Sequence, residues 1–290
     1  MSNLGHVTAE QAASYREHGY LYPIRAMTED EAADFRARVE ALEAEWLDNG
    51  LPLPLNTYKR VNAQIVMPVA HELGCHEGIL NAVEGVLGPD IMLYSVEFLI
   101  KEPNTKAVVT MHQDLTYWGM GEIDGLTTAW LALSPATKTS GCMDVVSGSH
   151  KNPILPHEDT FDGNNLLSRG QEIRVDVAEE DKVSMELRSG EISFHHGLTI
   201  HGSGPNSSDD RRIGVAIRYL IPEIAKSGGE RDFAHLARGR DDHGLWAPYR
   251  VPQVAFEPDA LKQYDAVRQL QTQVMMKGAK EDSAIYEKAG

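Results

Sequence analysis

Cysteine is scarce in this chain, and long apolar runs are absent. Its 290 residues include two cysteines, Cys75 and Cys142, too few for a disulfide framework and consistent with a reducing cytoplasm. No stretch approaches the roughly 18 consecutive apolar residues of a membrane span. The first residues, MSNLGHVTAE, show neither the basic nor the apolar part of a secretory signal. We therefore expect a cytoplasmic protein without a membrane partner.

Positive charge is also in short supply. Lysine and arginine number 27 against 43 aspartates and glutamates, which gives a formal net charge of −16. Nucleic acid and anionic membranes both bind cationic surfaces, so neither is expected as a partner. The same balance counts against substrates that carry several phosphates, such as coenzyme A thioesters.

Hydrophobic residues make up 42% of the chain, which is enough for a sizeable core. Because no repeat or long linker interrupts the sequence, we expect a single domain over residues 1–290. Its N-terminal segment (1–90) is expected to be helical and its middle (91–222) to form a β core. A loop and then a helix are expected over 223–290.

Two capping boxes predict where helices begin. Thr8 is followed three residues later by Gln11, and Thr28 by Glu31, the spacing at which side chains and backbone N–H groups satisfy each other at a helix start. A further short helix is expected over residues 79–88.

From residue 91 the pattern changes to short runs rich in β-branched and aromatic residues, such as IMLYSVEFLIK, LTTAWLALS and RRIGVAIRYLI. Clusters of glycine, proline, serine or asparagine bound most of them. Seven or eight strands without helices between them predict an antiparallel sandwich or barrel. We expect a mainly β fold with flanking helices, built as a double-stranded β-helix (a jelly roll, or cupin-like barrel).

The segment MHQDLTYWGM, residues 111–120, places a histidine and an aspartate two positions apart. Alternate side chains of a strand point to the same side, roughly 6.5–7 Å apart, so His112 and Asp114 would face one cavity. An imidazole and a carboxylate suit a borderline divalent metal, and one more histidine completes a facial triad. The pair alone is weak evidence, because His-x-Asp also occurs by chance.

The segment FHHGLTIHGSGPN offers three histidines as the third ligand: His195, His196 and His201. We choose His201 because the alternating run that contains it meets a turn and then leads into the strand RIGVAIRYL. His195 is at even spacing from His201, so one reading points it into the same cavity, where it would support the ligands or contact the substrate. Alternatively, it lies in the core or faces solvent.

The strand RIGVAIRYL has two different faces. Arg212, Gly214, Ala216 and Arg218 alternate with apolar and aromatic residues. An arginine followed by two very small residues suits a cavity wall that must admit a dicarboxylate. The alternative is a solvent-exposed face on which the arginines are simply hydrated.

These parts fit one chemistry. Two histidines and a carboxylate hold iron(II) on one face and leave three positions open. A keto acid can chelate two of them, and its distal carboxylate then needs a planar, permanently charged partner such as Arg212. Dioxygen takes the last position, and Ser203 would add a hydroxyl donor to the carboxylate.

Together these residues resemble the phytanoyl-CoA dioxygenase family of iron(II)/2-oxoglutarate oxygenases, which includes the ectoine hydroxylases. The similarity runs from EQAASYREHGYLYP through FLIKEPN, HQDLTYW, TAWLALSPATKTSGCMDVVSGSH and HGSGPNSSDDRR to RGRDDHGLWAPY. It implies a dioxygenase that hydroxylates a C–H bond of a small-molecule metabolite. Iron(II), 2-oxoglutarate and O₂ would be required, and succinate and CO₂ would be released.

The resemblance also implies roles for single residues. His112, Asp114 and His201 correspond to the iron ligands, and Arg212 corresponds to the salt-bridge partner of 2-oxoglutarate, with Ser203 beside it. Because halogenases of the family replace the carboxylate ligand with a small residue, the aspartate here favours hydroxylation.

Further pocket residues follow from the same resemblance. Trp130 matches a tryptophan that lines the co-substrate pocket, and Tyr94 falls where the family has another 2-oxoglutarate pocket residue of variable type. Lys59, Arg60, Asn62 and Gln64 lie on a segment that approaches the active-site mouth in the family. They are expected to contact the substrate or the co-substrate.

Two neighbouring aromatic residues bear on the substrate. Trp118 stands where enzymes that resemble ectoine hydroxylase have a tryptophan, and with Tyr117 it would form an aromatic wall for an amine-bearing or zwitterionic molecule. Alternatively, both rings belong to the core. The acidic composition likewise favours such a metabolite over an acyl-CoA.

Three other functions remain open. The chain could be an acyl-CoA hydroxylase of the same family. It could be a zinc- or manganese-dependent isomerase or hydrolase, which would need the triad but have no use for Arg212. A binding or sensing module would have lost a ligand, and none is lost here. The sequence determines neither the substrate nor the oligomeric state.

Overall fold

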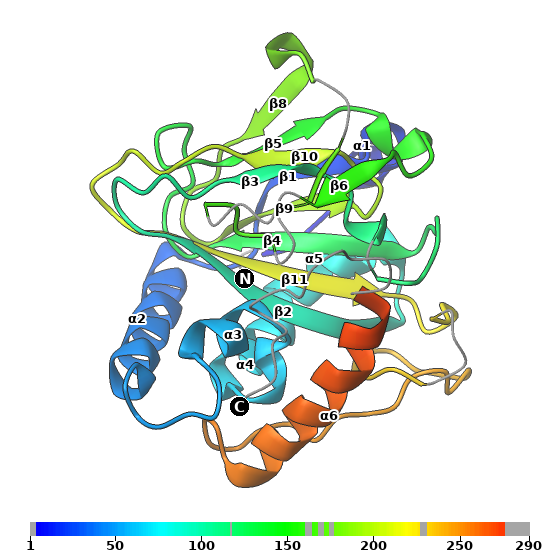
Figure 1. The fold of residues 1–290 in the computed structure, drawn as a ribbon. Helices are drawn as coiled ribbons and strands as arrows, with labels where there is room; N and C mark the ends of the chain where they lie inside the picture. The colour runs from blue at the N-terminus through cyan, green and yellow to red at the C-terminus, as the bar shows by residue number, and fades with distance from the viewer. Residues whose placement is uncertain are drawn as a thin grey trace.

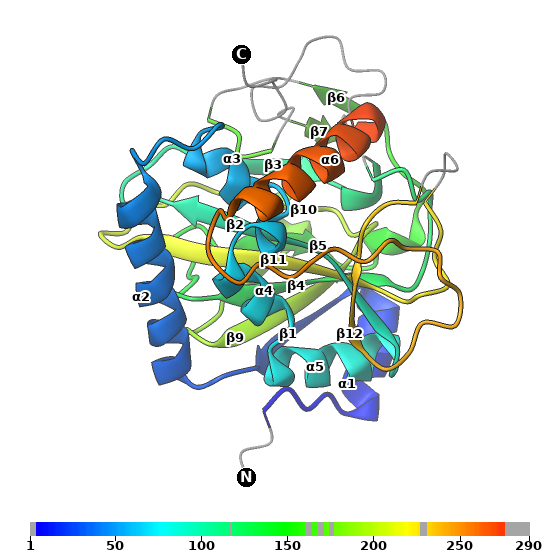
Figure 2. The same cartoon turned by 90° about the horizontal axis from the view of Figure 1, so that it is seen from below.

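Two antiparallel sheets lie face to face, and helices cover the outer side of the larger one (Figures 1 and 2). The computed structural model describes residues 4–116, 118–159, 164–167, 171–173, 177–226 and 231–275. The expectation of a mainly β fold with flanking helices, built as a double-stranded β-helix, is confirmed.

The α-helices of the described part gather below the larger sheet, except for α1, which packs beside β1 (Figure 1). They are α1 (Ala9–His18), α2 (Glu29–Trp46), α3 (Leu55–Arg60), α4 (Pro68–Gly74), α5 (Glu77–Leu87) and α6 (Pro258–Met275).

The larger sheet has the order β1-β9-β4-β11-β2-β12, the smaller one has the order β3-β10-β5-β8, and β6 pairs with β7. The strands are β1 (Tyr20–Arg25), β2 (Ile91–Lys101), β3 (Val109–His112), β4 (Leu126–Ala132), β5 (Met143–Val146), β6 (His157–Asp159), β7 (Gln171–Ile173), β8 (Lys182–Met185), β9 (Glu191–His196), β10 (His201–Ser203), β11 (Arg212–Leu220) and β12 (His235–Arg238).

Both predicted capping boxes are present. Thr8 Oγ1 accepts from the Gln11 N–H at 3.2 Å, while Gln11 Oε1 accepts from the Thr8 N–H at 2.9 Å, and Thr28 with Glu31 repeats the arrangement. Each cap stabilises its helix by about 1 kcal/mol. The helix expected over 79–88 is α5.

The N-terminal segment is not wholly helical, which corrects the expectation for residues 1–90. It contains β1, which pairs with β9 across more than 160 residues of sequence. Likewise β12 lies in the segment 223–290 that was expected to hold only a loop and a helix. Both are edge strands, and an edge strand is selected by the partner it pairs with more than by its own hydrophobic pattern.

The alternation predicted for β11 separates two environments. Ile213, Val215, Ile217 and Tyr219 are all 0% exposed and belong to the core beneath the helices. That core also contains Phe35, from the N-terminal segment. A shared core is what a single domain requires, although the division into three segments stays a prediction. In the described part of the chain, no helix is long and apolar enough to cross a bilayer.

Candidate active site

The opposite face of β11 lines a cavity between the two sheets. Arg212 and Arg218 on that face are 2% and 8% exposed, so the alternative of a hydrated outer surface is wrong. Strands of both sheets contribute to the lining, and the side chains of His112, Asp114 and His201 meet there.

The three predicted metal ligands converge. His112 Nε2 lies 3.4 Å and His201 Nε2 4.0 Å from Asp114 Oδ1, and one donor atom from each residue lies within 4.8 Å of the others. The two histidines are direct partners in the β3–β10 pairing. The spacing suggested that Asp114 shares a strand with His112, but the strand ends at His112. Asp114 starts the short 3₁₀ turn η2 (Asp114–Thr116), which brings the carboxylate to the imidazoles.

Backbone carbonyls orient both imidazoles. His112 Nδ1 lies 2.9 Å from the Thr110 carbonyl oxygen, and His201 Nδ1 lies 2.8 Å from that of Thr199. A ring that donates its Nδ1–H to a carbonyl keeps a lone pair on Nε2, and both Nε2 atoms face Asp114. Two oriented imidazoles and one carboxylate, all buried, are a donor set that fits iron(II).

The second oxygen of the carboxylate is held by other residues. Asp114 Oδ2 accepts a hydrogen bond from Thr128 Oγ1 at 3.3 Å, and it lies 3.5 Å from His195 Nε2 and 3.9 Å from Arg218 Nε. Burial alone would raise the pKa of Asp114, but Arg218 and the neighbouring imidazoles hold that pKa well below its usual value. Asp114 is therefore ionised, with Oδ1 left to face the two Nε2 atoms.

Two buried histidines of the site are kept neutral, His195 and His201. Burial, reinforced by neighbouring imidazoles, holds the pKa of His201 well below its usual value, and burial lowers the pKa of His195. His195 lies in the cavity, as one of the two sequence readings expected, with its ring centroid 4.2 Å from that of His201. Neutral imidazoles are the form that binds metal.

Arg212 is a buried cation. Its guanidinium lies over the ring of Trp130, 5.2 Å from the centroid, and donates to the carbonyls of Gly141 (2.5 Å) and Leu99 (3.1 Å). Within the described residues no carboxylate lies at ion-pairing distance, and Nε has no hydrogen-bond acceptor. Burial lowers the pKa of Arg212 to about 10, so it stays charged at neutral pH.

The small size of Gly214 suggested that this residue makes room in the cavity, but Trp130 fills the space above it. A Cβ at this position would lie 1.9 Å from Trp130 Cζ2. The tryptophan therefore occupies the space above the glycine and forms the surface on which the Arg212 guanidinium rests. Ala216 does line the cavity.

Lys101 was missed by the sequence analysis. It is the direct partner of Arg212 in the β2–β11 pairing, it is 0% exposed, and its Nζ donates to Ser203 Oγ at 2.7 Å. Burial, followed by the charge of Arg212, lowers the pKa of Lys101 to about 6. No local signal in FLIKEPN marks this lysine, because only the pairing of β2 with β11 places it beside Arg212.

Arg218 was noted in the sequence but given no role. It forms an ion pair with Glu97, donates to Ser95 Oγ at 3.1 Å and stacks over Trp118, 4.6 Å from the ring centroid. One face of the Trp118 ring thus holds a guanidinium of the protein itself. Trp118 lines the cavity, and so does Arg60, one of the residues expected near the active-site mouth.

Three predicted pocket residues do not reach the cavity wall. The hydroxyl of Tyr94 donates to Asp232 at 3.2 Å, the amide of Gln64 bridges backbone groups of Tyr94 and Val96, and Asn62 donates to Gln271 at 2.6 Å. Their polar groups hold β2 and α6 in place, and none of the three lines the cavity, so their contacts with substrate or co-substrate stay predictions. Tyr117 lies outside the described residues.

Comparison with known proteins adds independent information. Residues 15–214 match the family model described as phytanoyl-CoA dioxygenase. A probable phytanoyl-CoA dioxygenase of Caenorhabditis elegans is 26% identical over 241 residues, 76% of this chain and 77% of the relative. A probable alpha-ketoglutarate-dependent hypophosphite dioxygenase of Stutzerimonas stutzeri is 27% identical, with 74% and 79% covered.

Solved structures show the same architecture. The non-heme monooxygenase ThoJ in its apo form superposes with a TM-score of 0.82 at 30% identity, over 92% of this chain and 98% of ThoJ. A complex of ThoJ with nickel superposes with a TM-score of 0.75 at 28% identity, over 91% of this chain and 98% of that one.

Proposed function

Because the chain belongs to the phytanoyl-CoA dioxygenase family and is an iron(II)- and 2-oxoglutarate-dependent dioxygenase, we propose that it hydroxylates a C–H bond of a small metabolite in the cavity between its sheets. The proposed iron ligands are His112, Asp114 and His201. One observation carries the assignment: two imidazoles and a carboxylate converge in a buried cavity whose wall holds Arg212, a cation without a carboxylate partner among the described residues.

The chain's residues have distinct parts in the reaction. When bound, iron(II) would activate O₂, which is the oxidant. 2-Oxoglutarate would be oxidised to CO₂ and succinate, which takes one oxygen atom, and the other oxygen atom would become the hydroxyl group on the substrate. Thr110 and Thr199 keep the Nε2 lone pairs of the two histidines on the metal side. Thr128 and Arg218 keep the carboxylate ionised and oriented.

The proposed co-substrate position lies between the triad and the buried side chains of Arg212 and Lys101. A dicarboxylate would bring Arg212 the negative charge that it lacks among the described residues, and a guanidinium binds a carboxylate through two parallel hydrogen bonds. The Lys101 amine donates to Ser203 Oγ, which would donate its own proton to the same carboxylate.

The cavity wall suits a small zwitterionic substrate. Outside the proposed metal and diacid positions it carries charges of both signs, with Glu97 and Arg218 paired and Arg60 nearby. An aromatic wall of Trp118 alone is less suited to a cationic group than expected, because Arg218 already stacks on that ring. An acyl-CoA is the second candidate, favoured by the substrate in the names of several relatives.

We place the enzyme in the cytoplasm. Cys75 and Cys142 are both free thiols, as a reducing compartment requires. The zinc or manganese isomerase or hydrolase remains the competing function, and it leaves the buried charge of Arg212 without a purpose.

The test is an anaerobic titration. Iron(II) and 2-oxoglutarate added to the apoprotein should give the weak visible charge-transfer band of the chelated diacid, and Arg212→Ala should abolish it at the same diacid concentration. A panel of amino acids, betaines and acyl-CoA esters is then screened for substrate-stimulated succinate formation. No band in the wild-type protein would reject the oxygenase in favour of the hydrolase or isomerase.

A further inference from the structure

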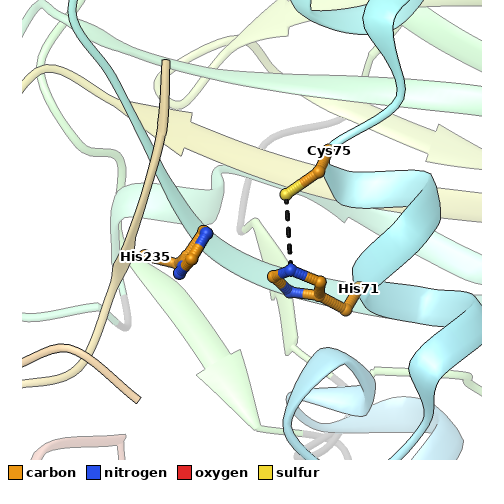
Figure 3. A group of neighbouring side chains, drawn as sticks. All are labelled: His71, Cys75 and His235. Carbon is orange, nitrogen blue, oxygen red and sulfur yellow. Dashed lines mark hydrogen bonds between the residues drawn. The ribbon is translucent and has the colours of Figure 1, made fainter. Parts of the chain in front are cut away.

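A second group of potential metal ligands lies away from the active-site cavity. Figure 3 shows His71 and Cys75 one turn apart on and just after α4, with the imidazole of His235 pointing at them from the facing chain at the start of β12. One donor atom from each lies within 4.8 Å of the others, and all three residues are half-buried. None of them lines the cavity between the sheets.

We propose that His71, Cys75 and His235 form a second metal site, selective for zinc(II), that fastens α4 to the edge strand β12. Two imidazoles and a thiolate are the ligands that zinc prefers. No carboxylate belongs to the group, so hard cations such as Mg²⁺ and Ca²⁺ are excluded as its occupants.

The spacing of two donors already matches tetrahedral zinc. Cys75 Sγ lies 3.6 Å from His71 Nε2. With Zn–S and Zn–N bonds of about 2.3 and 2.0–2.1 Å at a tetrahedral angle, the two donors should be about 3.5 Å apart. The helix achieves this because residues four apart lie on the same face. The donor atom of His235 lies within 4.8 Å of the other two, so this ring would approach them to close the site, and solvent would take the fourth position.

Tyr249 supplies the outer support that a ligating histidine needs. Its hydroxyl lies 3.0 Å from His71 Nδ1, and the Tyr249 residue is 4% exposed. If Nδ1 donates to this oxygen, the Nε2 lone pair faces the thiol, which is the tautomer required for binding metal. The phenol stays protonated, because burial raises the pKa of Tyr249 well above its usual value.

The fold holds the helix end firmly against the strand that carries His235. The Tyr219 hydroxyl donates to the Gly74 carbonyl at 2.8 Å. A Cβ on Gly74 would lie 2.5 Å from Leu93 Cδ2, and Leu93 is the partner of His235 in the β2–β12 pairing. The glycine thus lets α4 approach β2 closely enough for its last turn to meet β12.

Zinc binding at this cluster has a simple proton balance. It would form a Zn–S bond with Cys75 and release the thiol proton to solvent.

Cobalt(II) distinguishes this site from the iron site. Apoprotein prepared with a chelator is titrated with Co²⁺, and a thiolate-to-cobalt charge-transfer band in the near ultraviolet is recorded. The proposed iron ligands contain no sulfur, so the band should appear in the wild-type protein and in His201→Ala. It should be lost in Cys75→Ser and retained in the matched control Cys142→Ser. Zinc should displace the cobalt and bleach the band.

Further variants protect the test against a folding failure. His235→Gln keeps the thiol and should weaken Co²⁺ binding at least tenfold, while Tyr249→Phe should weaken it by about tenfold through loss of the support to His71. Absence of the band in the folded wild-type protein would overturn the proposal. So would a band that survives both Cys75→Ser and His235→Gln, and the cluster would then be a hydrogen-bonded pair packed against a third ring.

Discussion

The two faces of β11 contain similar numbers of residues and have opposite roles. The helix side holds Ile213, Val215 and Ile217, fully buried in a continuous apolar core. The cavity side holds Arg212 and Arg218, which are almost as buried and yet charged. Burying apolar side chains stabilises the fold by roughly 1.5–3 kcal/mol each, whereas burying arginines costs free energy unless something neutralises them. One face therefore holds the protein together, and the other is prepared for charged ligands.

The largest expected effect is the loss of the proposed metal ligands. Asp114→Ala and His112→Ala should lower turnover about a thousandfold or more, because a bound metal contributes several kcal/mol of transition-state stabilisation. Circular dichroism should show an intact fold. His196→Ala is the matched control: it neighbours His195 but contacts Asp124 instead of the cavity, and should keep turnover. Loss of folding in both ligand variants would mean that these residues are structural.

The next effect separates two adjacent arginines. Arg212→Ala should raise KM for 2-oxoglutarate by at least about thirtyfold, since removing one partner of a buried charge pair costs about 2–5 kcal/mol. Arg211→Ala should leave KM unchanged, because Arg211 pairs with Glu102 and Glu43 on the outside. Steady-state kinetics with varied 2-oxoglutarate measures both. If Arg212→Ala and the wild-type protein had equal KM values for 2-oxoglutarate, the diacid would not bind at Arg212.

Substitutions at neighbouring residues on the two faces of β11 should change different quantities: stability on the core side and catalysis on the cavity side. Ile217→Ala should lower the free energy of unfolding by about 2–5 kcal/mol and leave KM for 2-oxoglutarate unchanged. Ala216→Val adds bulk to the cavity wall and should lower kcat/KM about 10- to 200-fold, with a smaller change in stability. Denaturant unfolding and kinetics on the same two proteins test the contrast. It fails if both variants change the same quantity.

The smallest effect concerns Lys101 in the apoprotein. Its pKa is about 6 in the folded chain against about 10.4 for an unperturbed lysine, so the unfolded state binds more protons between these values. The free energy of unfolding should therefore rise with pH across that range through this group. Lys101→Met should stabilise the apoprotein by on the order of 1 kcal/mol or more at pH 7, and the difference should shrink toward pH 10. The same variant should bind 2-oxoglutarate more weakly. A pH-independent difference would mean that Lys101 is charged in the fold.

The proposed zinc cluster shows where sequence reading fails. His71 and Cys75 share a helix and could have been paired by their spacing. His235 lies 160 residues further along, on an edge strand whose pattern was not distinctive. The same limit applies to Lys101, which only the pairing of β2 with β11 places beside Arg212.

Local and periodic features were readable from the sequence by itself. Capping boxes act over three residues, and the alternation of β11 follows from strand geometry, so both could be predicted without a partner. The metal triad could be chosen because donor chemistry restricts which residue types serve. Tertiary structure alone decided the rest: the turn that swings Asp114 toward the histidines, the tryptophan above Gly214, and the tethering of Gln64 and Asn62 away from the cavity. These depend on contacts between segments distant in sequence, whose geometry no local pattern specifies.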